Sequence, residues 1–259
     1  MRKTILITND DGFESNGLRA LKEALEPLAN IIVVAPTLEK SACGHSLTLT
    51  RPLRFIELEE NFYKLDDGTP SDCVFLSLTK LFKEKKPDLV VSGINKGVNL
   101  GEDITYSGTA AAAMEAVLQG IPAVAISQAY NEYKDLDNFD YALAKKTIAN
   151  IVKKIFKEDY PLEDRRFLNI NIPFAKEAEG IKITHAGRRE YGCDAQVHIN
   201  PRGQEYYWIG LPKMEWKKHP NPLHDYSDIE AINDGFISIS PIHLDLTHYN
   251  SIKRLEAWI

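Results

Sequence analysis

Residues 4–13 have the sequence TILITNDDGF, in which a short apolar run ends in an asparagine and two adjacent aspartates. A second uninterrupted apolar run, IIVVAP, occupies 31–36. Such Val and Ile runs are typical of strands buried on both faces, as in a parallel sheet covered by helices. Between the two runs, leucines recur at helical spacing over 17–30. This stretch therefore predicts a βαβ unit.

The alternation of strand and helix continues through the first half of the chain. DLVVSG (88–93) and PAVAIS (122–127) are further apolar runs, and TAAAAMEAVLQG (109–120) between them predicts a helix that ends at Gly120. Repeated βα units indicate a doubly wound α/β fold. We therefore predict a Rossmann-like, mostly parallel sheet with helices on both faces.

Another helix is predicted to begin at Thr69, an N-cap residue followed by Pro70, with Asp72 near the positive end of the helix dipole. We expect it to continue through VFLSLTKLFKEKK (74–86). Three segments before it have the composition of shorter strands: SLTLT (46–50), LRFIEL (53–58) and FYKL (62–65).

The second half of the chain keeps the same class. A long amphipathic helix is predicted over 139–156, and further strands are predicted at 167–173, 180–186 and 236–242. The stretch 187–226 differs, because VHINPRGQEYYWIG (197–210) predicts two strands about a Pro-Arg-Gly turn. An exposed aromatic hairpin of this kind is suited to contact another subunit or to cover a site. We expect one domain, 1–259, with 187–226 as a projecting C-terminal hairpin arm.

Composition and charge narrow the class of protein. The 259 residues are 44% hydrophobic and carry a formal net charge of -6, with no dense Lys/Arg run beyond KEKK at 83–86. These values disfavour a nucleic-acid polymer or an anionic membrane as partner. We find no signal peptide and no apolar stretch long enough to span a bilayer, so we expect a cytosolic protein. Cys43, Cys73 and Cys193 form no CxxC pattern and are expected to be reduced packing residues.

Oxygen-bearing side chains follow three of the predicted strands. In open α/β sheets, ligands bind beyond the carboxyl ends of the strands, where these loops meet. Asp10 and Asp11 can converge on a divalent cation, and the Ser41 hydroxyl and the Asn95 amide oxygen complete a shell suited to Mg²⁺ or Mn²⁺. The alternative is that the aspartates form an Asx turn and that Ser41 and Asn95 are ordinary loop residues. Both interpretations stay open at this point.

The loop SGINKGVNLGEDITYSGT (92–109) precedes an alanine-rich helix, whose free N-terminal N–H groups favour an anion. A phosphate there could accept hydrogen bonds from Ser107, Thr109 and Asn99, although Ser107 or Thr109 could instead only cap the helix. Neither GxGxxG nor GxxxxGK[ST] occurs, so a dinucleotide dehydrogenase or a P-loop NTPase is unsupported. Phosphatases with an aspartate nucleophile need two aspartates separated by one residue, so a metal-activated water is the expected nucleophile here.

Specific motifs run through nearly the whole chain: NDDG (9–12), VVAP with KSACGHSLT (33–36 and 40–48), GTPSDCV (68–74), PDLVVSGIN with NLG (87–95 and 99–101), YSGTAAAAMEA (106–116), NINIP (169–173), ITHAGRREY (183–191) and DGFISISPIHLDLT (234–247). With these motifs the sequence closely resembles the SurE family of stationary-phase survival proteins. The resemblance implies a cytosolic, metal-dependent 5'/3'-nucleotidase that removes phosphate from nucleoside monophosphates, with activity on short polyphosphate also reported for the family.

The resemblance also assigns roles to residues. The family's metal ligands fall on Asp10, Asp11, Ser41 and Asn95. Its phosphate contacts fall on Asn9, Asn99, Ser107, Gly108 and Thr109. In this picture one of the two aspartates orients or deprotonates the attacking water, and the helix N-terminus stabilises charge in the transition state.

One departure concerns the C-terminal segment. Some members carry Asp-Leu-Thr-Ala-His, whose Asp and His have been given a catalytic role, whereas this chain has DLTHYN. Asp245 matches the motif, but His248 stands one position early, so we leave both outside the catalytic set and the general acid unassigned. Family members also exchange hairpins and C-terminal segments, which implies a homodimer or a homotetramer.

Two other functions share these features. The chain could be a nucleotide-binding regulatory module without turnover, or a phosphatase for another small phosphoester or for polyphosphate. Two carboxylates beside an anionic phosphate favour an enzyme over a binding module, because only a metal reconciles the like charges. Base, sugar and metal preference are not encoded in any motif of the sequence.

Overall fold

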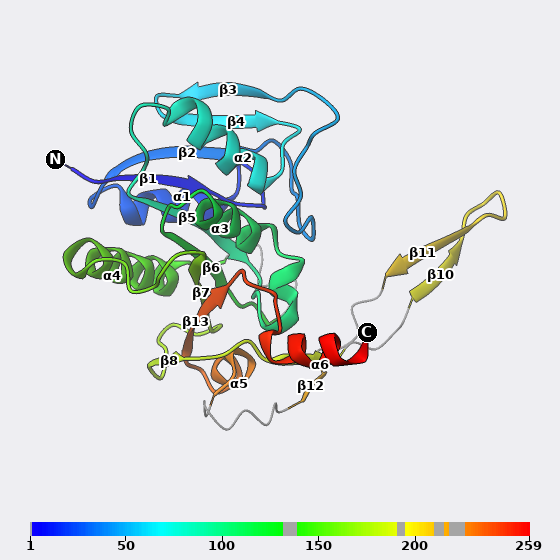
Figure 1. Ribbon diagram of the computed structural model, residues 1–259. Coiled ribbons are helices and arrows are strands. Elements are labelled where there is room, and N and C mark those ends of the chain that lie inside the picture. Colours follow the sequence, from blue (N-terminus) through cyan, green and yellow to red (C-terminus); the bar gives the residue numbers. More distant parts are fainter. Residues whose placement is uncertain (1, 132–138, 191–194, 210–214, 218–225) are drawn as a thin grey trace.

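The computed structural model describes residues 2–131, 139–190, 195–209, 215–217 and 226–259. Its centre is a nine-stranded sheet with the strand order β3-β4-β2-β1-β5-β6-β7-β13-β8 (Figure 1). The strands are β1 (Thr4–Thr8), β2 (Asn30–Pro36), β3 (Arg54–Glu59), β4 (Phe62–Asp66), β5 (Leu89–Lys96), β6 (Ala123–Gln128), β7 (Arg166–Ile172), β8 (Ile181–Ile183) and β13 (Ile237–His243).

Most neighbours in this sheet run parallel. β1 pairs in parallel with both β2 and β5, and the parallel order continues through β6 to β7. Antiparallel pairs join β3 to β4 and β13 to β7. The predicted doubly wound, mostly parallel α/β sheet is therefore confirmed.

Helices cover both faces of the sheet, and each face has its own hydrophobic core (Figure 1). On one face, α1 (Asn16–Leu25) and α4 (Ala142–Glu158) pack on alternate strand residues such as Ile5 and Ile7. On the other face, α2 (Pro70–Leu76) and α3 (Gly108–Leu118) pack on the intervening Leu6. Burial on both faces explains why the strand sequences contain uninterrupted apolar runs.

The start of α2 follows the sequence closely. The Thr69 side chain accepts a hydrogen bond from the Asp72 N–H, and the Asp72 carboxylate accepts one from the Thr69 N–H, which forms a capping box. The predicted end of this helix, at residue 86, is wrong, because α2 ends at Leu76. The backbone widens into a π-helical turn over Ser77–Leu81, and residues 83–86 are not helical.

The predicted strand SLTLT (46–50) is wrong, because this segment is an extended loop outside the sheet. The Thr48 N–H and hydroxyl donate to the two carboxylate oxygens of Asp72, at 2.9 and 2.6 Å. Leu49 is 86% exposed. The Asp72 carboxylate therefore accepts the hydrogen bond of the Thr48 N–H, which a neighbouring strand would otherwise accept.

The C-terminal region adds small elements to this body. β9 (Arg188–Glu190) pairs antiparallel with β12 (Glu215–Lys217). β10 (Ala195–Ile199) and β11 (Glu205–Ile209) form the predicted hairpin, which stands away from the body in Figure 1 and exposes Tyr207 and Trp208. Short helices α5 (Asp228–Asn233) and α6 (Ile252–Trp258) follow. The rest of the predicted arm and Cys193 lie outside the described residues.

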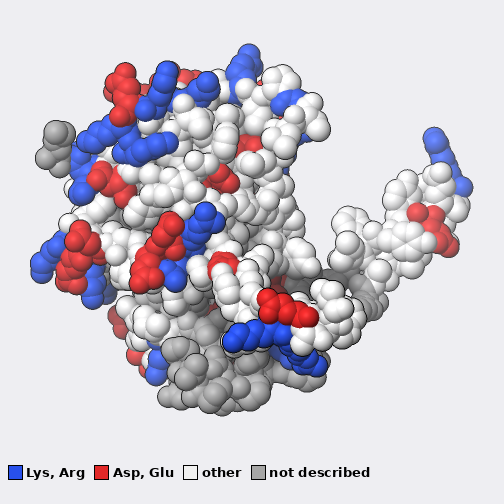
Figure 2. All heavy atoms as spheres, in the orientation of Figure 1, with Lys and Arg blue, Asp and Glu red and all other residues white. Residues whose placement is uncertain are grey.

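Charges are mixed over the surface. On the face drawn in Figure 2, Lys and Arg side chains alternate with Asp and Glu, so the described residues of that face form no continuous basic surface. Within the described parts of the chain, no helix is long and apolar enough to cross a bilayer. Cys43 and Cys73 are both free thiols, as expected.

Gly17 provides a test of how closely α1 packs on the sheet. A Cβ at this position would lie 2.0 Å from the Ile94 carbonyl oxygen. Helix propensity alone predicts that Gly17→Ala stabilises the protein by about 1 kcal/mol. Because of the steric overlap, we expect Gly17→Ala to lower the free energy of unfolding by about 1–3 kcal/mol, measured by urea titration.

The matched control is Lys22→Ala, a substitution at a more exposed position of the same helix, which we expect to change stability by less than about 0.5 kcal/mol. A gain in stability for Gly17→Ala would show that the α1–β5 contact is looser than described.

Candidate functional site

Asp10 lies at the carboxyl end of β1, where it meets the N-terminus of α3. It is only 3% exposed. Its two carboxylate oxygens accept hydrogen bonds from the Thr109 N–H, at 3.0 Å, and from the Thr109 hydroxyl, at 2.5 Å. Burial raises the pKa of Asp10, and the hydrogen bonds from Thr109 oppose that shift. The carboxylate is therefore held in one orientation by the first turn of the helix.

Asp11 is the neighbouring carboxylate and lines a cavity. It accepts a long hydrogen bond of 3.4 Å from the Lys96 N–H. Burial, followed by the charge of Asp10, raises the pKa of Asp11 to about 7. Asp11 is thus a half-buried carboxylate next to the buried Asp10, and its one hydrogen bond, at 3.4 Å, compensates its charge only weakly. A bound cation would relieve this repulsion.

Asn95 follows an irregularity in β5 and precedes Lys96, whose N–H contacts Asp11. The pairing of β5 with β6 shifts register between Ser92 and Asn95. Gly93 lies in this bulge with φ +135, and a Cβ there would be 2.2 Å from the Ile126 carbonyl oxygen, so only glycine fits. The Asn95 amide donates to the Gly97 carbonyl at 2.8 Å. Its amide NH₂ is thereby fixed, and its carbonyl oxygen is the end that could coordinate a cation.

Ser41 lies in the loop after β2 and borders the same cavity as Asp11. Its hydroxyl donates to Glu39 at 2.7 Å. The backbone brings this loop to the aspartates, because the Lys40 N–H donates to the Asp10 carbonyl oxygen at 2.7 Å. Glu39 is a third carboxylate of the site that the sequence reasoning missed. The sequence does indicate Glu39, because it lies only two residues before Ser41 in the same loop.

The donor chemistry fits a hard cation. Within the described ranges, no group of three or more His, Cys, Asp and Glu side chains could hold a metal ion. A metal at this edge of the sheet would therefore need the Ser41 hydroxyl and the Asn95 amide oxygen in addition to Asp10 and Asp11. Such an all-oxygen set suits Mg²⁺ or Mn²⁺ and does not suit a softer metal.

The expected phosphate contacts at α3 lie beside Asp10. Ser107 is the N-cap residue, and its Oγ accepts a hydrogen bond from the Ala110 N–H at 3.0 Å. A Cβ on Gly108 would lie 2.8 Å from Cβ of Asp10, so the helix start packs directly against the carboxylate. Both donors of Thr109 point at Asp10. Ser107 therefore caps α3, and Thr109 holds Asp10. A phosphate contact of Ser107 or Thr109 stays a prediction.

Asn9 supports the turn that follows β1. Its amide donates to the Gly12 carbonyl at 3.0 Å and to the Ser15 hydroxyl oxygen at 2.7 Å. Ser15 is in turn the N-cap of α1. The Asn9 Oδ1 atom is buried and has no hydrogen-bond partner among the described residues.

Asn99 is held by a buried polar network. Its side chain donates to the Ser127 hydroxyl at 2.8 Å. Its N–H donates to Asn171 Oδ1 at 2.8 Å, and its carbonyl accepts from Asn169, at 2.9 Å, and from Asn171, at 3.1 Å. The sequence reasoning missed this network. The alternating asparagines of FLNINIP, on one face of an otherwise apolar strand, were the signal.

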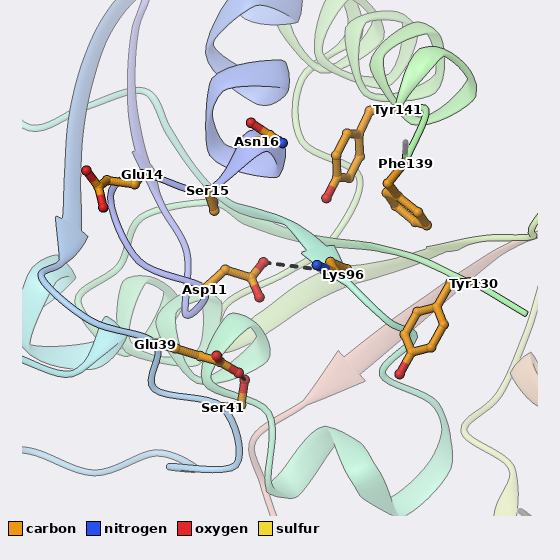
Figure 3. Close-up of a pocket in the computed structure, with 10 residues that line it drawn as sticks. All are labelled: Asp11, Glu14, Ser15, Asn16, Glu39, Ser41, Lys96, Tyr130, Phe139 and Tyr141. Carbon is orange, nitrogen blue, oxygen red and sulfur yellow. Dashed lines mark hydrogen bonds between the residues drawn. The ribbon is translucent and has the colours of Figure 1, made fainter. Parts of the chain in front are cut away.

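The cavity beside Asp11 has a volume of about 650 Å³ (Figure 3). It is lined by Asp11, Glu14, Ser15, Asn16, Glu39, Ser41, Lys96, Tyr130, Phe139 and Tyr141. Figure 3 shows carboxylates and Ser41 on one side and aromatic rings on the other. None of the aromatic residues was singled out from the sequence, because they lie far from every motif.

Asp245 and His248 make local contacts in the C-terminal segment. Asp245 accepts hydrogen bonds from the Thr247 N–H and the Tyr249 hydroxyl, and the hydrogen bond from Tyr249 is the main cause that lowers the pKa of Asp245 to about 2. His248 Nδ1 lies 2.6 Å from Ser251 Oγ. These contacts order the segment before α6 and add no residue to the site just described.

Comparison with known proteins gives one consistent match. Residues 5–193 match the family model "Survival protein SurE". A protein of Sulfurovum sp. (strain NBC37-1) named 5'-nucleotidase SurE is 61% identical, over 100% of this chain and 98% of the relative. A protein of the same name from Helicobacter hepaticus (strain ATCC 51449 / 3B1) is 56% identical, over 99% of both chains.

Solved structures agree with the sequence comparisons. The crystal structure of the SurE protein from Aquifex aeolicus has a TM-score of 0.83 and 42% sequence identity, and the match covers 98% of this chain and 99% of that chain. The two molecules therefore share one fold over their whole length.

The asparagine network around Asn99 generates a prediction about stability. We expect Asn171→Ala to lower the free energy of unfolding by about 1–3 kcal/mol, because it leaves the buried Asn99 N–H without an acceptor. The matched control is Asn150→Ala on the exposed side of α4, for which helix propensity predicts no loss. Equal stabilities of Asn171→Ala and the wild type in urea titrations would contradict a role for Asn171 in holding Asn99.

Proposed function

The chain belongs to the SurE family of survival proteins, and we propose that it is a 5'-nucleotidase that hydrolyses nucleoside 5'-monophosphates with the help of one divalent cation. The observation that carries this proposal is the pair of adjacent carboxylates at the carboxyl end of β1, with Asp10 buried against the N-terminus of α3 and Asp11 half-buried at the cavity. Relatives that are 61% and 56% identical to this chain bear the name 5'-nucleotidase SurE. Adjacent carboxylates next to a helix N-terminus match the needs of metal-assisted phosphoester hydrolysis.

The proposed cation site consists of Asp10, Asp11, Ser41 and Asn95. A divalent cation bound there would activate the phosphoryl group and the attacking water as a Lewis acid. Asp10 is kept in place by Thr109. Asp11, at the cavity surface, is the carboxylate that orients the water or accepts its proton.

The proposed phosphate site consists of Asn9, Asn99, Ser107, Gly108 and Thr109. The Gly108 N–H and the Ser107 hydroxyl, at the positive end of the α3 dipole, would stabilise the charge that develops on the phosphoryl oxygens, and Thr109 contributes by holding Asp10. Hydrogen bonds within the fold hold Asn9, through Gly12 and Ser15, and Asn99, through Ser127. This arrangement binds and orients the phosphate ester without a covalent intermediate.

Finer properties of the family are also part of the proposal. We infer activity on 3'-monophosphates and on short polyphosphate in addition to 5'-monophosphates, with Mg²⁺ or Mn²⁺ as the cation. The exposed Tyr207 and Trp208 of the β10–β11 hairpin support assembly into a homodimer or homotetramer. A phosphatase that acts on other small phosphoesters would use the same residues. Only its substrate preference would distinguish it from a nucleotidase.

The first test is phosphate release from nucleoside 5'- and 3'-monophosphates and from glycerol phosphate, with Mn²⁺, Mg²⁺ or EDTA. We expect metal-dependent release that prefers nucleotides. Asp10→Asn should lower kcat by at least about 100-fold, because a neutral amide binds a hard cation poorly and cannot accept both Thr109 donors in the same way. Ser107→Ala should lower kcat/KM by about tenfold through the lost phosphate contact.

The control variant is Asp66→Asn, which changes an exposed carboxylate at the end of β4 and should leave kcat unchanged. Phosphate release that persists in EDTA and in Asp10→Asn would rule out the metal mechanism. Nucleotide binding without release from any substrate would favour a regulatory module.

Gly108 tests the close contact of α3 with Asp10. A Cβ on Gly108 would approach Asp10 Oδ2 to 3.0 Å and Cys43 Sγ to 3.1 Å. We expect Gly108→Ala to displace the Asp10 carboxylate and to lower kcat by about 10- to 100-fold, since small displacements of catalytic groups have effects of this size. The double variant Gly108→Ala/Cys43→Ala should recover only part of the loss, because Asp10 remains crowded; full recovery would assign the effect to Cys43.

A further inference from the structure

The cavity beside Asp11 and Ser41, two residues of the proposed cation site, has two chemically different sides. One side carries Asp11, Glu39 and Ser41, and the opposite side carries the rings of Tyr130 and Phe139 (Figure 3). Because Asp11 belongs to the proposed cation site, the phosphate group of a substrate would lie at the first side. Whatever is attached to that phosphate would extend toward the rings.

Neighbouring residues support the ring of Phe139 on the aromatic side of the cavity. Phe139 packs edge-to-face on Tyr141, with ring centroids 4.8 Å apart and an interplanar angle of 74°. Tyr141 is only 7% exposed, so it acts as a fixed backing for Phe139, which is half-buried. The Gln128 side chain at the end of β6 donates to the Asp140 carbonyl at 2.7 Å. This bond ties the strand that precedes Tyr130 to the segment that carries Phe139.

These two sides restrict the chemical class of the ligand. A purely apolar ligand would desolvate the carboxylates of Asp11, Glu14 and Glu39 without compensation. Inorganic phosphate or glycerol phosphate would leave the rings unused. A cavity of about 650 Å³ is within the range that holds a ligand of nucleotide size.

We propose that Phe139 and Tyr130 form the nucleobase-binding surface of this enzyme and determine its preference for nucleotides over phosphoesters without a base. The proposal rests on the proposed function, because it places the phosphate at Asp11, and it extends that function by assigning the residues that recognise the base. Every base has a flat π-face, so this surface accepts purines and pyrimidines with modest differences between them.

The test compares AMP with ribose 5-phosphate, which carries the same phosphoester but no base. We expect Phe139→Ala and Phe139→Leu to lower kcat/KM for AMP by about 5- to 100-fold, the range for loss of one base-stacking ring. Both variants should change kcat/KM for ribose 5-phosphate less than about twofold. Phe139→Tyr keeps the ring and should retain the wild-type preference, and Tyr130→Leu should act in the same direction as Phe139→Leu.

The control is Phe75→Ala on α2, a partly exposed phenylalanine outside the cavity, which should change neither value. An equal loss on both substrates in Phe139→Leu would overturn the proposal, because it would assign Phe139 a structural role. Unchanged values for both substrates in Phe139→Leu and Tyr130→Leu would overturn it as well.

If the protein is not a nucleotidase, the result differs from those above, because the wild type then releases phosphate from neither AMP nor ribose 5-phosphate. In that case AMP binding, measured by calorimetry in Mg²⁺, tests the aromatic surface separately. A lower AMP affinity in Phe139→Leu than in wild type and Phe139→Tyr would support the base-binding surface. Equal affinities in the three proteins would overturn it.

Discussion

The two hydrogen bonds from Thr109 to Asp10 are the interaction on which the site depends. They join the carboxyl end of β1 to the first turn of α3 and allow a carboxylate to remain buried at this junction. The backbone carbonyl of Asp10 also accepts from Lys40, which fixes the loop that carries Ser41. One residue therefore positions a strand, a helix and a loop that are far apart in the sequence.

Close backbone contacts make this arrangement possible. α3 can approach Asp10 because Gly108 has no side chain, and β5 can bulge toward the site because Gly93 leaves room for the Ile126 carbonyl. A polar network then holds the loop after β5, through the contacts of Asn99 with Ser127 and Asn171. Such networks restrict a site to one geometry because each buried donor has one available acceptor.

The proposed chemistry follows from the contrast between the two sides of the cavity. Carboxylates and the Ser41 hydroxyl line the side of the cavity at Asp11, which is where we propose that a hard cation and a phosphate ester bind. Aromatic rings stand on the other side, where a base can lie flat. The chain belongs to the SurE family and shares its fold with the SurE protein from Aquifex aeolicus. The hairpin of β10 and β11 stands away from the body in Figure 1.

The sequence by itself determined the βα order, the buried strands, the capping box of α2 and the loops that meet at the carboxyl ends of the strands. These features depend on periodicity and on short-range contacts, which are local in the chain. It could not show that Thr48, in the loop 46–50, donates to Asp72, or that Thr109 donates both its N–H and its hydroxyl to Asp10. Likewise, Glu39, the asparagines of β7 and the ring of Phe139 entered the site only with the tertiary structure. A hydrogen-bond donor or an aromatic ring can in principle contact many residues of the chain. Only the three-dimensional packing decides which of them lies next to it.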